Sequence, residues 1–210
     1  MRTVLVGMVG GLIALVGLAG TANASATVDL IWQSTGTGTI SGLAISDSIT
    51  LDVVITAGPN GSNGGSLSID YSAVVGTLSV TGFSNTLDGF WFFSPGGAPT
   101  DPGDDIIHAV NAGSMCGAFG SCLANTESQR IGTVTFQVDA LPGGSLEIFV
   151  GLFDGSDGVG DALGGDACPG GVGCTFNSGF AVVPEPGTLS LLGMGLGGLY
   201  VVGRRSSRKR

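Results

Sequence analysis

The sequence predicts an all-β domain, an antiparallel β-sandwich, between an export signal and a membrane-spanning tail. Three observations favour it. Apolar and polar residues alternate in several short runs, Gly- and Pro-rich turns separate these runs, and the middle of the chain lacks a strong helical period. The 210 residues are 43% hydrophobic and only 11% charged, which argues against disorder. The 40 glycines follow no collagen period and suit tight turns between strands.

Four runs alternate clearly, and in each the apolar residues point to one face of a strand. These apolar residues are Ile49, Leu51, Val53 and Ile55; Leu67, Ile69 and Tyr71; Val134, Phe136 and Val138; and Leu146, Ile148, Val150 and Leu152. Weaker runs occur at Val28–Trp32, Leu78–Phe83 and Phe180–Val183. One apolar and one polar side per strand is typical of antiparallel sheets packed face to face. Seven or more such strands predict a sandwich over residues 27–182.

Charge is distributed unevenly along the chain. Between Thr27 and Val183, Arg130 is the only basic residue, against fifteen Asp and Glu, so this region carries a formal charge of −14. Such a charge disfavours nucleic acid or an anionic membrane surface as a partner. A divalent cation or a basic surface suits it better.

The N-terminal segment, residues 1–26, has the features of a secretory signal peptide. Arg2 supplies a positive start, an apolar run follows over 4–19, and two overlapping Ala-x-Ala patterns end at Ala24 and Ala26. Cleavage there would export the mature protein. The alternative is an uncleaved N-terminal anchor.

The C-terminal segment has the composition of a membrane helix. Residues 188–203 are apolar throughout, near the short limit of about 17 residues for a span. The five basic residues that follow would hold the tail in the cytoplasm. Pro184 and Pro186 mark the change from folded domain to membrane segment, because proline is excluded from helix interiors. The sequence therefore predicts a precursor anchored in the inner membrane. The alternative to a processed segment is a plain tail anchor.

This end resembles the PEP-CTERM sorting signal of Gram-negative bacteria. The residues that match are Val183, Pro184, Glu185, Pro186, Gly187 and Thr188, followed by the Gly/Leu-rich span and the Arg-rich terminus within 183–210. The resemblance implies processing by an exosortase, a transpeptidase-like membrane enzyme. The product would be released or transferred to the cell envelope surface or extracellular matrix of a Gram-negative bacterium.

The middle region looks like the cohesin-like domains, a jelly-roll β-sandwich family related to carbohydrate-binding modules. The order of an early alternating strand over 45–56, a Gly/Ser turn, the run 66–83 and the late run 131–154 carries this resemblance. Two Gly-rich inserts that contain cysteine depart from the family's pattern.

The four cysteines form two Cys-x5-Cys pairs, and an exported protein meets oxidising conditions. Three connectivities exist, of which we favour the two local pairs, Cys116–Cys122 and Cys168–Cys174. A zinc site is the competing interpretation. It is disfavoured because His108 is the only histidine and the spacing does not match a zinc motif.

The stretch 153–166 is the best candidate for a metal site. Asp154, Ser156, Asp157 and Asp161 offer the hard oxygen ligands that Ca²⁺ prefers, and Asp166 could add to them. The spacing is not that of an EF-hand, so the alternative is a solvated acidic loop. Asp101, Asp104 and Asp105 form a second, weaker candidate.

Residues 90–93 hold four consecutive aromatic side chains, and adjacent strand residues point to opposite faces. The alternatives are a core position and a ligand platform made by Trp91 and Phe93, on which a sugar could stack.

No catalytic motif is recognisable in the sequence, and His108 has no nucleophile at a diagnostic spacing. We therefore expect a non-enzymatic surface or matrix protein associated with exopolysaccharide, without a cofactor unless calcium binds. The alternatives are a cohesin-like carbohydrate- or protein-binding module and, through paired carboxylates, a glycoside-acting enzyme.

Overall fold

The structure, a computed structural model, describes residues 26–86, 97–114, 122–141 and 143–183. In these residues the chain is almost entirely strands and turns. The strands are β1 Ala26–Trp32, β2 Thr39–Ser41, β3 Ser48–Ala57, β4 Gly64–Asp70, β5 Leu78–Asn85, β6 Ile106–Gly113, β7 Ser128–Val138, β8 Gly144–Gly151, β9 Gly158–Gly160, β10 Cys174–Asn177 and β11 Gly179–Val183. Two 3-10 turns, Ser72–Val74 and Pro169–Gly171, accompany them. Within this part of the chain no helix is long and apolar enough to span a membrane.

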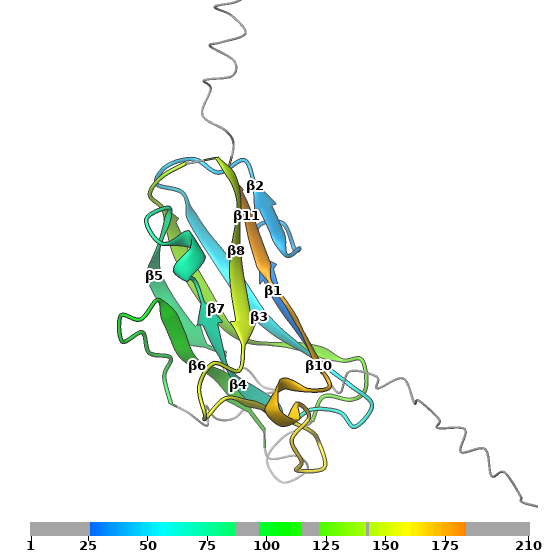
Figure 1. Cartoon of the computed structure of the whole chain (residues 1–210). Helices are drawn as coiled ribbons and strands as arrows, with labels where there is room; N and C mark the ends of the chain where they lie inside the picture. Colours follow the sequence, from blue (N-terminus) through cyan, green and yellow to red (C-terminus); the bar gives the residue numbers. More distant parts are fainter. Residues whose placement is uncertain (1–25, 87–96, 115–121, 142, 184–210) are drawn as a thin grey trace, which may run out of the picture.

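The strands form two layers packed face to face, as expected for a β-sandwich (Figure 1). One sheet has the order β10-β1-β3-β7-β5, and the other has the order β2-β11-β8-β4-β6. The short strand β9 pairs with β4 beside this second sheet. The alternating runs of the sequence supply most of these strands, so the all-β prediction is confirmed.

The predicted inward faces are the faces that the structure buries. Along β3, Ile49, Leu51, Val53 and Ile55 are all buried. The same holds for Leu67 and Ile69 on β4 and for the predicted apolar residues of β7. On β8, Ile148 and Val150 are buried and Leu146 is partly buried against the core, as is Leu152 just after the strand.

The purely antiparallel prediction is wrong at one side of the sandwich. β1 pairs with β10 in parallel, and β11 pairs with β2 in parallel. The reason is that residues 26–41 and residues 174–183 run side by side, and each segment passes from one sheet to the other. The other strand pairs are antiparallel.

Close approach at this crossing depends on glycine. The Phe180 amide donates to the Gly38 carbonyl at 2.7 Å. A Cβ atom on Gly179 would lie 3.3 Å from side-chain atoms of Leu30 and Leu51, and one on Gly38 would lie 3.3 Å from the Leu30 carbonyl oxygen. Because these contacts are tighter than ordinary van der Waals distances, a larger residue would push the two segments apart.

Three aromatic side chains form the centre of the core. The rings of Trp32 and Phe136 are 6.2 Å apart, and those of Tyr71 and Phe136 are 6.3 Å apart. All three are buried. The Trp32 indole Nε1 also donates to the Phe180 carbonyl at 3.0 Å, which ties β1 of one sheet to β11 of the other.

Strand β6 was not predicted from the sequence, which indicated only a weaker metal-site candidate, Asp101, Asp104 and Asp105, just before it. Its alternation is interrupted, since the register against β4 shifts between Leu67 and Ile69. Ala109 has φ 59° at this irregularity, in the left-handed region. The very short strands β2 and β9, and the strand β10, were also not predicted.

The two ends of the described chain lie at opposite ends of the sandwich (Figure 1). β1 begins at Ala26, one residue before the expected start of the domain. β11 ends at Val183, so the expected boundary between residues 182 and 183 falls inside a strand. The predicted signal peptide, up to residue 25, and the predicted membrane segment 188–203 lie outside the described residues.

Replacing Trp32 with phenylalanine should destabilise the sandwich. Trp32→Phe removes the bond to the Phe180 carbonyl and leaves a small void, which should lower the free energy of unfolding by about 1–3 kcal/mol. Equilibrium urea unfolding of residues 26–183 measures this. The control is Val75→Ala at an exposed site, which should change stability by less than about 0.5 kcal/mol. Equal stability of Trp32→Phe and the unsubstituted domain would contradict the role given to this bond.

Candidate functional site

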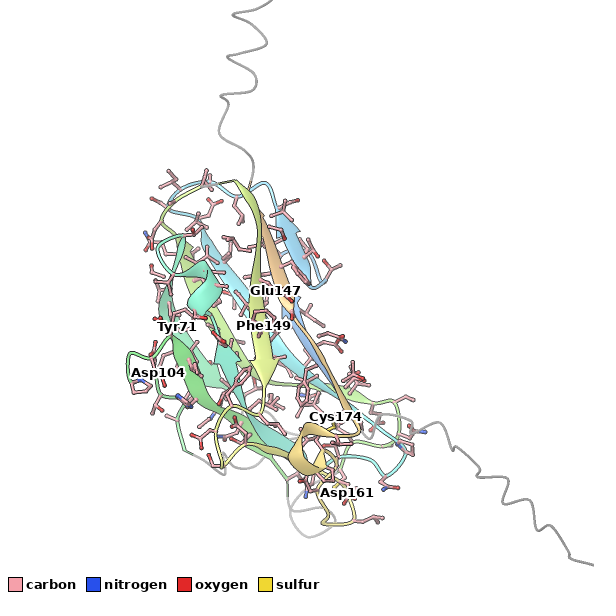
Figure 2. The ribbon with its side chains drawn as sticks, viewed as in Figure 1. Tyr71, Asp104, Glu147, Phe149, Asp161 and Cys174 are labelled. Carbon is pink, nitrogen blue, oxygen red and sulfur yellow. A yellow bond between two sulfur atoms is a disulfide. The ribbon has the colours of Figure 1, made fainter. Side chains whose placement is uncertain are left out.

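The described candidate residues of the stretch 153–166 lie toward the end of the sandwich opposite Val183, because β8, which precedes them, runs antiparallel to β11. Asp161 and Cys174 mark this end in Figure 2, beside the 3-10 turn Pro169–Gly171. The segment between β8 and β9 and the longer segment between β9 and β10 meet there. A cavity of about 640 Å³ lies between them, lined by Phe153, Asp157, Asp166, Val172 and Phe176 among others.

The first acidic turn holds three of the four predicted calcium ligands. The amide of Asp154 donates to Asp157 Oδ2 at 2.9 Å, and the amide of Ser156 donates to Asp154 Oδ1 at 3.0 Å. Ser68 of β4 donates its hydroxyl to Asp157 Oδ2 at 2.7 Å. These carboxylates therefore already accept hydrogen bonds from the protein, as aspartates do when they bond to backbone amides of their own turn.

Asp157 is the more buried of the two carboxyl groups of this turn. Its Oδ1 atom is buried and has no hydrogen-bond partner. Burial raises the pKa of Asp157, and the hydrogen bond from Ser68 only partly opposes that effect. The ionised form is thus less favourable here than at the surface.

Asp161, the fourth predicted ligand, belongs to a different turn. Its Oδ1 accepts from the amides of Leu163 at 2.9 Å and Gly165 at 2.7 Å. Strand β9 separates this turn from Asp154 and Asp157. In the part of the chain that the structure describes, no three His, Cys, Asp or Glu side chains form a group that could hold a metal ion. The calcium site stays a prediction.

His108 links the two acidic stretches, a contact that the sequence analysis missed. Its Nε2 lies 3.0 Å from Asp104 Oδ2, and its Nδ1 lies 3.4 Å from Asp154 Oδ2. The hydrogen bond with His108 lowers the pKa of Asp104, and hydrogen bonds from Ser156 lower the pKa of Asp154. No local signal could have revealed this bridge, because His108 and Asp154 meet only through the packing of β6 beside the β8–β9 segment.

The second predicted acidic cluster supports its own loop. Tyr71 donates its hydroxyl to Asp101 Oδ2 at 2.5 Å, while the Gly103 amide donates to Asp101 Oδ1 at 2.9 Å. Burial and the neighbouring Asp101 raise the pKa of Tyr71. Asp105 has φ 62°, in the left-handed region. These bonds fix the approach of the chain to β6.

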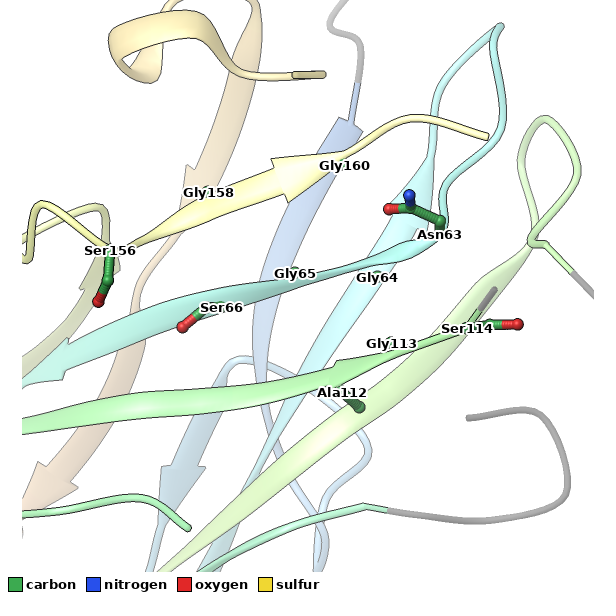
Figure 3. A pocket seen from close by; sticks show the side chains of 10 residues that line it. All are labelled: Asn63, Gly64, Gly65, Ser66, Ala112, Gly113, Ser114, Ser156, Gly158 and Gly160. Carbon is green, nitrogen blue, oxygen red and sulfur yellow. The ribbon is translucent and has the colours of Figure 1, made fainter. Parts of the chain in front are cut away.

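A smaller groove of about 270 Å³ crosses β9, β4 and β6 (Figure 3). Its floor includes a row of three glycines in register, since Gly160 opposes Gly64 and Gly64 opposes Gly113. The rim is uncharged and includes Asn63 and Ser156. A Cβ atom on Gly64 would clash with the Ala112 carbonyl oxygen, so glycine here lets β4 and β6 approach each other closely.

The outer face of the second sheet carries exposed apolar side chains. Phe149 on β8 is 40% exposed, and Phe180 and Val182 on β11 are 36% and 37% exposed. Glu147 lies directly opposite Phe180, and Asp70 lies opposite Phe149 (Figure 2 labels Glu147 and Phe149). We call Phe149, Phe180, Val182, Glu147 and Asp70 the β8–β11 face. The alternation of β8 already places Phe149 outward, but its pairing with β11 was not predictable.

The disulfide prediction is confirmed for one pair. Cys168 and Cys174 are bonded, with a Cα–Cα distance of 5.3 Å. Cys122 is also disulfide-bonded, and Cys116 lies outside the described residues. The predicted aromatic platform, Trp91 and Phe93, lies outside them too, as do the sorting residues 184–188.

The raised pKa of Asp157 predicts a pH-dependent stability difference. A carboxyl group whose pKa is higher in the folded than in the unfolded protein contributes less to the stability of the fold as pH rises. This contribution is lost between the usual pKa, 3.8, and the pKa in the folded protein. Asp157→Asn keeps an oxygen acceptor for Ser68 and cannot ionise. Relative to the unsubstituted protein, we expect Asp157→Asn to gain thermal stability on going from pH 3.5 to pH 7.

Thermal midpoints of both proteins from pH 3.5 to 7, in a chelating buffer, provide the measurement. Asp166→Asn is the control, because it removes a carboxylate from an exposed position nearby in the sequence. A relative loss of stability by Asp157→Asn as pH rises would mean that the ionised carboxylate is favoured in the fold.

The C-terminal segment matches a family model. Residues 182–209 match the PEP-CTERM protein-sorting motif, which implies an exported surface protein that an exosortase processes. No curated protein sequence matches the chain.

The described domain is similar in structure to several cohesins. A cohesin of Clostridium acetobutylicum, determined in solution, has a TM-score of 0.53 at 14% identity and covers 79% of this chain and 94% of its own. The third cohesin of ScaC from Acetivibrio cellulolyticus, in complex with the ScaB dockerin, has a TM-score of 0.51 at 9% identity and covers 76% and 99%. A non-cellulosomal cohesin from Archaeoglobus fulgidus has a TM-score of 0.50 at 14% identity and covers 76% and 91%. At these identities the similarity shows the fold alone. The chain therefore carries a PEP-CTERM protein-sorting motif behind a β-sandwich similar to those of cohesins.

Proposed function

We propose that this protein is an exported, exosortase-sorted, non-enzymatic component of the cell surface or extracellular matrix, associated with exopolysaccharide. The sorting motif at 182–209 is the observation that carries the proposal. The signal peptide over residues 1–26 supplies export, and the segment 188–203 holds the precursor in the inner membrane of a Gram-negative cell until processing.

The position of the chain ends supports this arrangement. The sorting segment follows directly from the end of β11. Both cavities are lined by residues of the segment that follows β8, which lies toward the opposite end because β8 runs antiparallel to β11. A precursor held by its tail would therefore present the disulfide-bonded end away from the membrane. The formal charge of −14 over residues 27–183 also disfavours contact with anionic lipid headgroups.

Changing Pro184, Glu185 and Pro186 to alanine should abolish processing. In a host with an exosortase, the unsubstituted protein should lose its tail and reach the envelope surface or medium, whereas the triple variant should keep Arg210 and stay with the inner membrane. Cell fractionation followed by intact-mass measurement checks both results. The control is the unsubstituted protein in a host without exosortase, which should also keep its tail. Processing of the triple variant would refute the role of this motif.

A specific binding module is the second candidate function, and the β8–β11 face favours it. Three exposed apolar side chains on adjacent strands, beside two carboxylates, form a surface that suits stacking against sugar rings. One of the similar cohesins was determined in complex with a protein, a dockerin, so a protein ligand is the other option for such a module.

Replacing Phe149 and Phe180 together with alanine should weaken binding to the exopolysaccharide of the host. Two lost aromatic contacts should reduce affinity roughly tenfold or more. Co-sedimentation of the protein with purified exopolysaccharide, titrated to saturation, measures this. The matched control replaces Ile45 and Val75, which are exposed elsewhere, and should leave the affinity unchanged. Equal binding by all three proteins would exclude the β8–β11 face as the carbohydrate site.

A further inference from the structure

The sorting motif and the folded domain overlap by two residues. The motif match begins at residue 182, and β11 extends to Val183. Val182 opposes Ser41 of β2 on one side and Ser145 of β8 on the other, and Val183 opposes Gly144. Val182 and Val183 are therefore strand residues of the sandwich as well as the first residues of the sorting segment.

Strand β11 cannot leave the sheet without disturbing the core. It is an interior strand, between β2 and β8. Its Ala181 is fully buried, and its Phe180 carbonyl accepts the hydrogen bond from the Trp32 indole. An enzyme that cuts a peptide bond needs the backbone around that bond free. Pro184 has no amide hydrogen to donate to a neighbouring strand. The peptide bond between Val183 and Pro184 is therefore the first after β11 that can be cut without removing a residue from the strand.

The N-terminal end is constrained in the same way. Ala26 is 1% exposed and opposes Ala57 of β3 and Cys174 of β10. The disulfide between Cys168 and Cys174 anchors this part of β10. Of the two Ala-x-Ala patterns, one leads to cleavage after Ala24 and keeps Ala26 in β1. The other leads to cleavage after Ala26 and removes a buried, paired residue from an interior strand.

We infer that the sheet sets both limits of the mature chain, which begins at Ser25 and ends at Val183 or beyond. The inference rests on the proposed export and sorting. At the first limit, water hydrolyses the bond between Ala24 and Ser25, leaving a carboxylate on Ala24 and an amine on Ser25. At the second, the acyl group on the N-terminal side of the cut passes to water or to an acceptor nucleophile. The tail then leaves as an amine that carries the nucleophile's proton.

A consequence is that Val182 and Val183 are needed only as residues of strand β11. The exosortase then recognises the residues from Pro184 onward. The two positions should then accept another residue that suits a β-strand. Threonine is β-branched like valine and keeps the strand propensity. The chain also has no spacer between domain and motif, so the cut should move with the motif when a spacer is inserted.

The test uses the full-length chain in an exosortase-positive host, with intact-mass measurement and sequencing of both termini. We expect an N-terminus at Ser25 and a C-terminal residue at Val183 or later. An N-terminus at Met1 or Thr27 overturns the first limit, and a folded product that ends before Val183 overturns the second while leaving the sorting proposal intact. A chain that keeps Arg210 in this host refutes the sorting proposal and, with it, the second limit.

Two variants of the full-length chain sharpen the test. Val182→Thr with Val183→Thr should be processed within about twofold of the unsubstituted rate; a loss of more than tenfold in a folded protein would show that the enzyme reads the valines. Inserting Gly-Ser-Gly-Ser between Val183 and Pro184 should give a mature product that keeps all four added residues. A folded product of the spacer variant that ends before Val183 would overturn the second limit.

Discussion

The parallel pairing of the first and last strand segments is the constraint on which the rest of this sandwich depends. Residues 26–41 and 174–183 run side by side, and each contributes a strand to both sheets. The hydrogen bond from the Trp32 indole to the Phe180 carbonyl joins the sheets at the point where the segments cross. Because both partners lie in interior strands, the core cannot close until the two ends of the domain have met. This long-range contact is entropically costly to form and is expected to come late in folding.

The two ends of the sandwich differ in structure. At the end near Val183, strand β11 leads directly into the sorting segment. The opposite end consists of turns, and these turns are held by local bonds: the carboxylates of Asp154, Asp157 and Asp161 accept backbone amides, and a disulfide closes the loop at Cys168. A display function is compatible with this division, since the surface built from loops is at the end that does not carry the tail.

The same local bonds use part of the hydrogen-bonding capacity of the aspartates in the acidic turns. An aspartate that already accepts amide hydrogens has fewer lone pairs for a cation. The exception is Asp157 Oδ1, which is buried without a partner. Burial of this atom disfavours the charged form of the group, which is why the stability contribution of Asp157 depends on pH.

Much of the fold could be predicted from the sequence, because alternation is a local property. A strand with one buried face repeats with period two whatever its partner is, so Ile49 to Ile55 and Val134 to Val138 were assigned to the core correctly. Strand β6 was missed because a bulge with Ala109 in the left-handed region interrupts that period. The bond between Cys168 and Cys174 was predictable for the same local reason, since the residues are six apart.

The sequence by itself thus determined the fold class, the inward faces of the long strands and the sorting motif. Each of these depends on residues that are contiguous in the chain. Only the tertiary structure decided which strands are neighbours, that two of the pairs are parallel, and that His108 lies between Asp104 and Asp154. It also decided that Ala26 and Val183 belong to interior strands. The physical reason is that pairing and burial depend on residues far apart in the chain, and no period within a single segment encodes its partner.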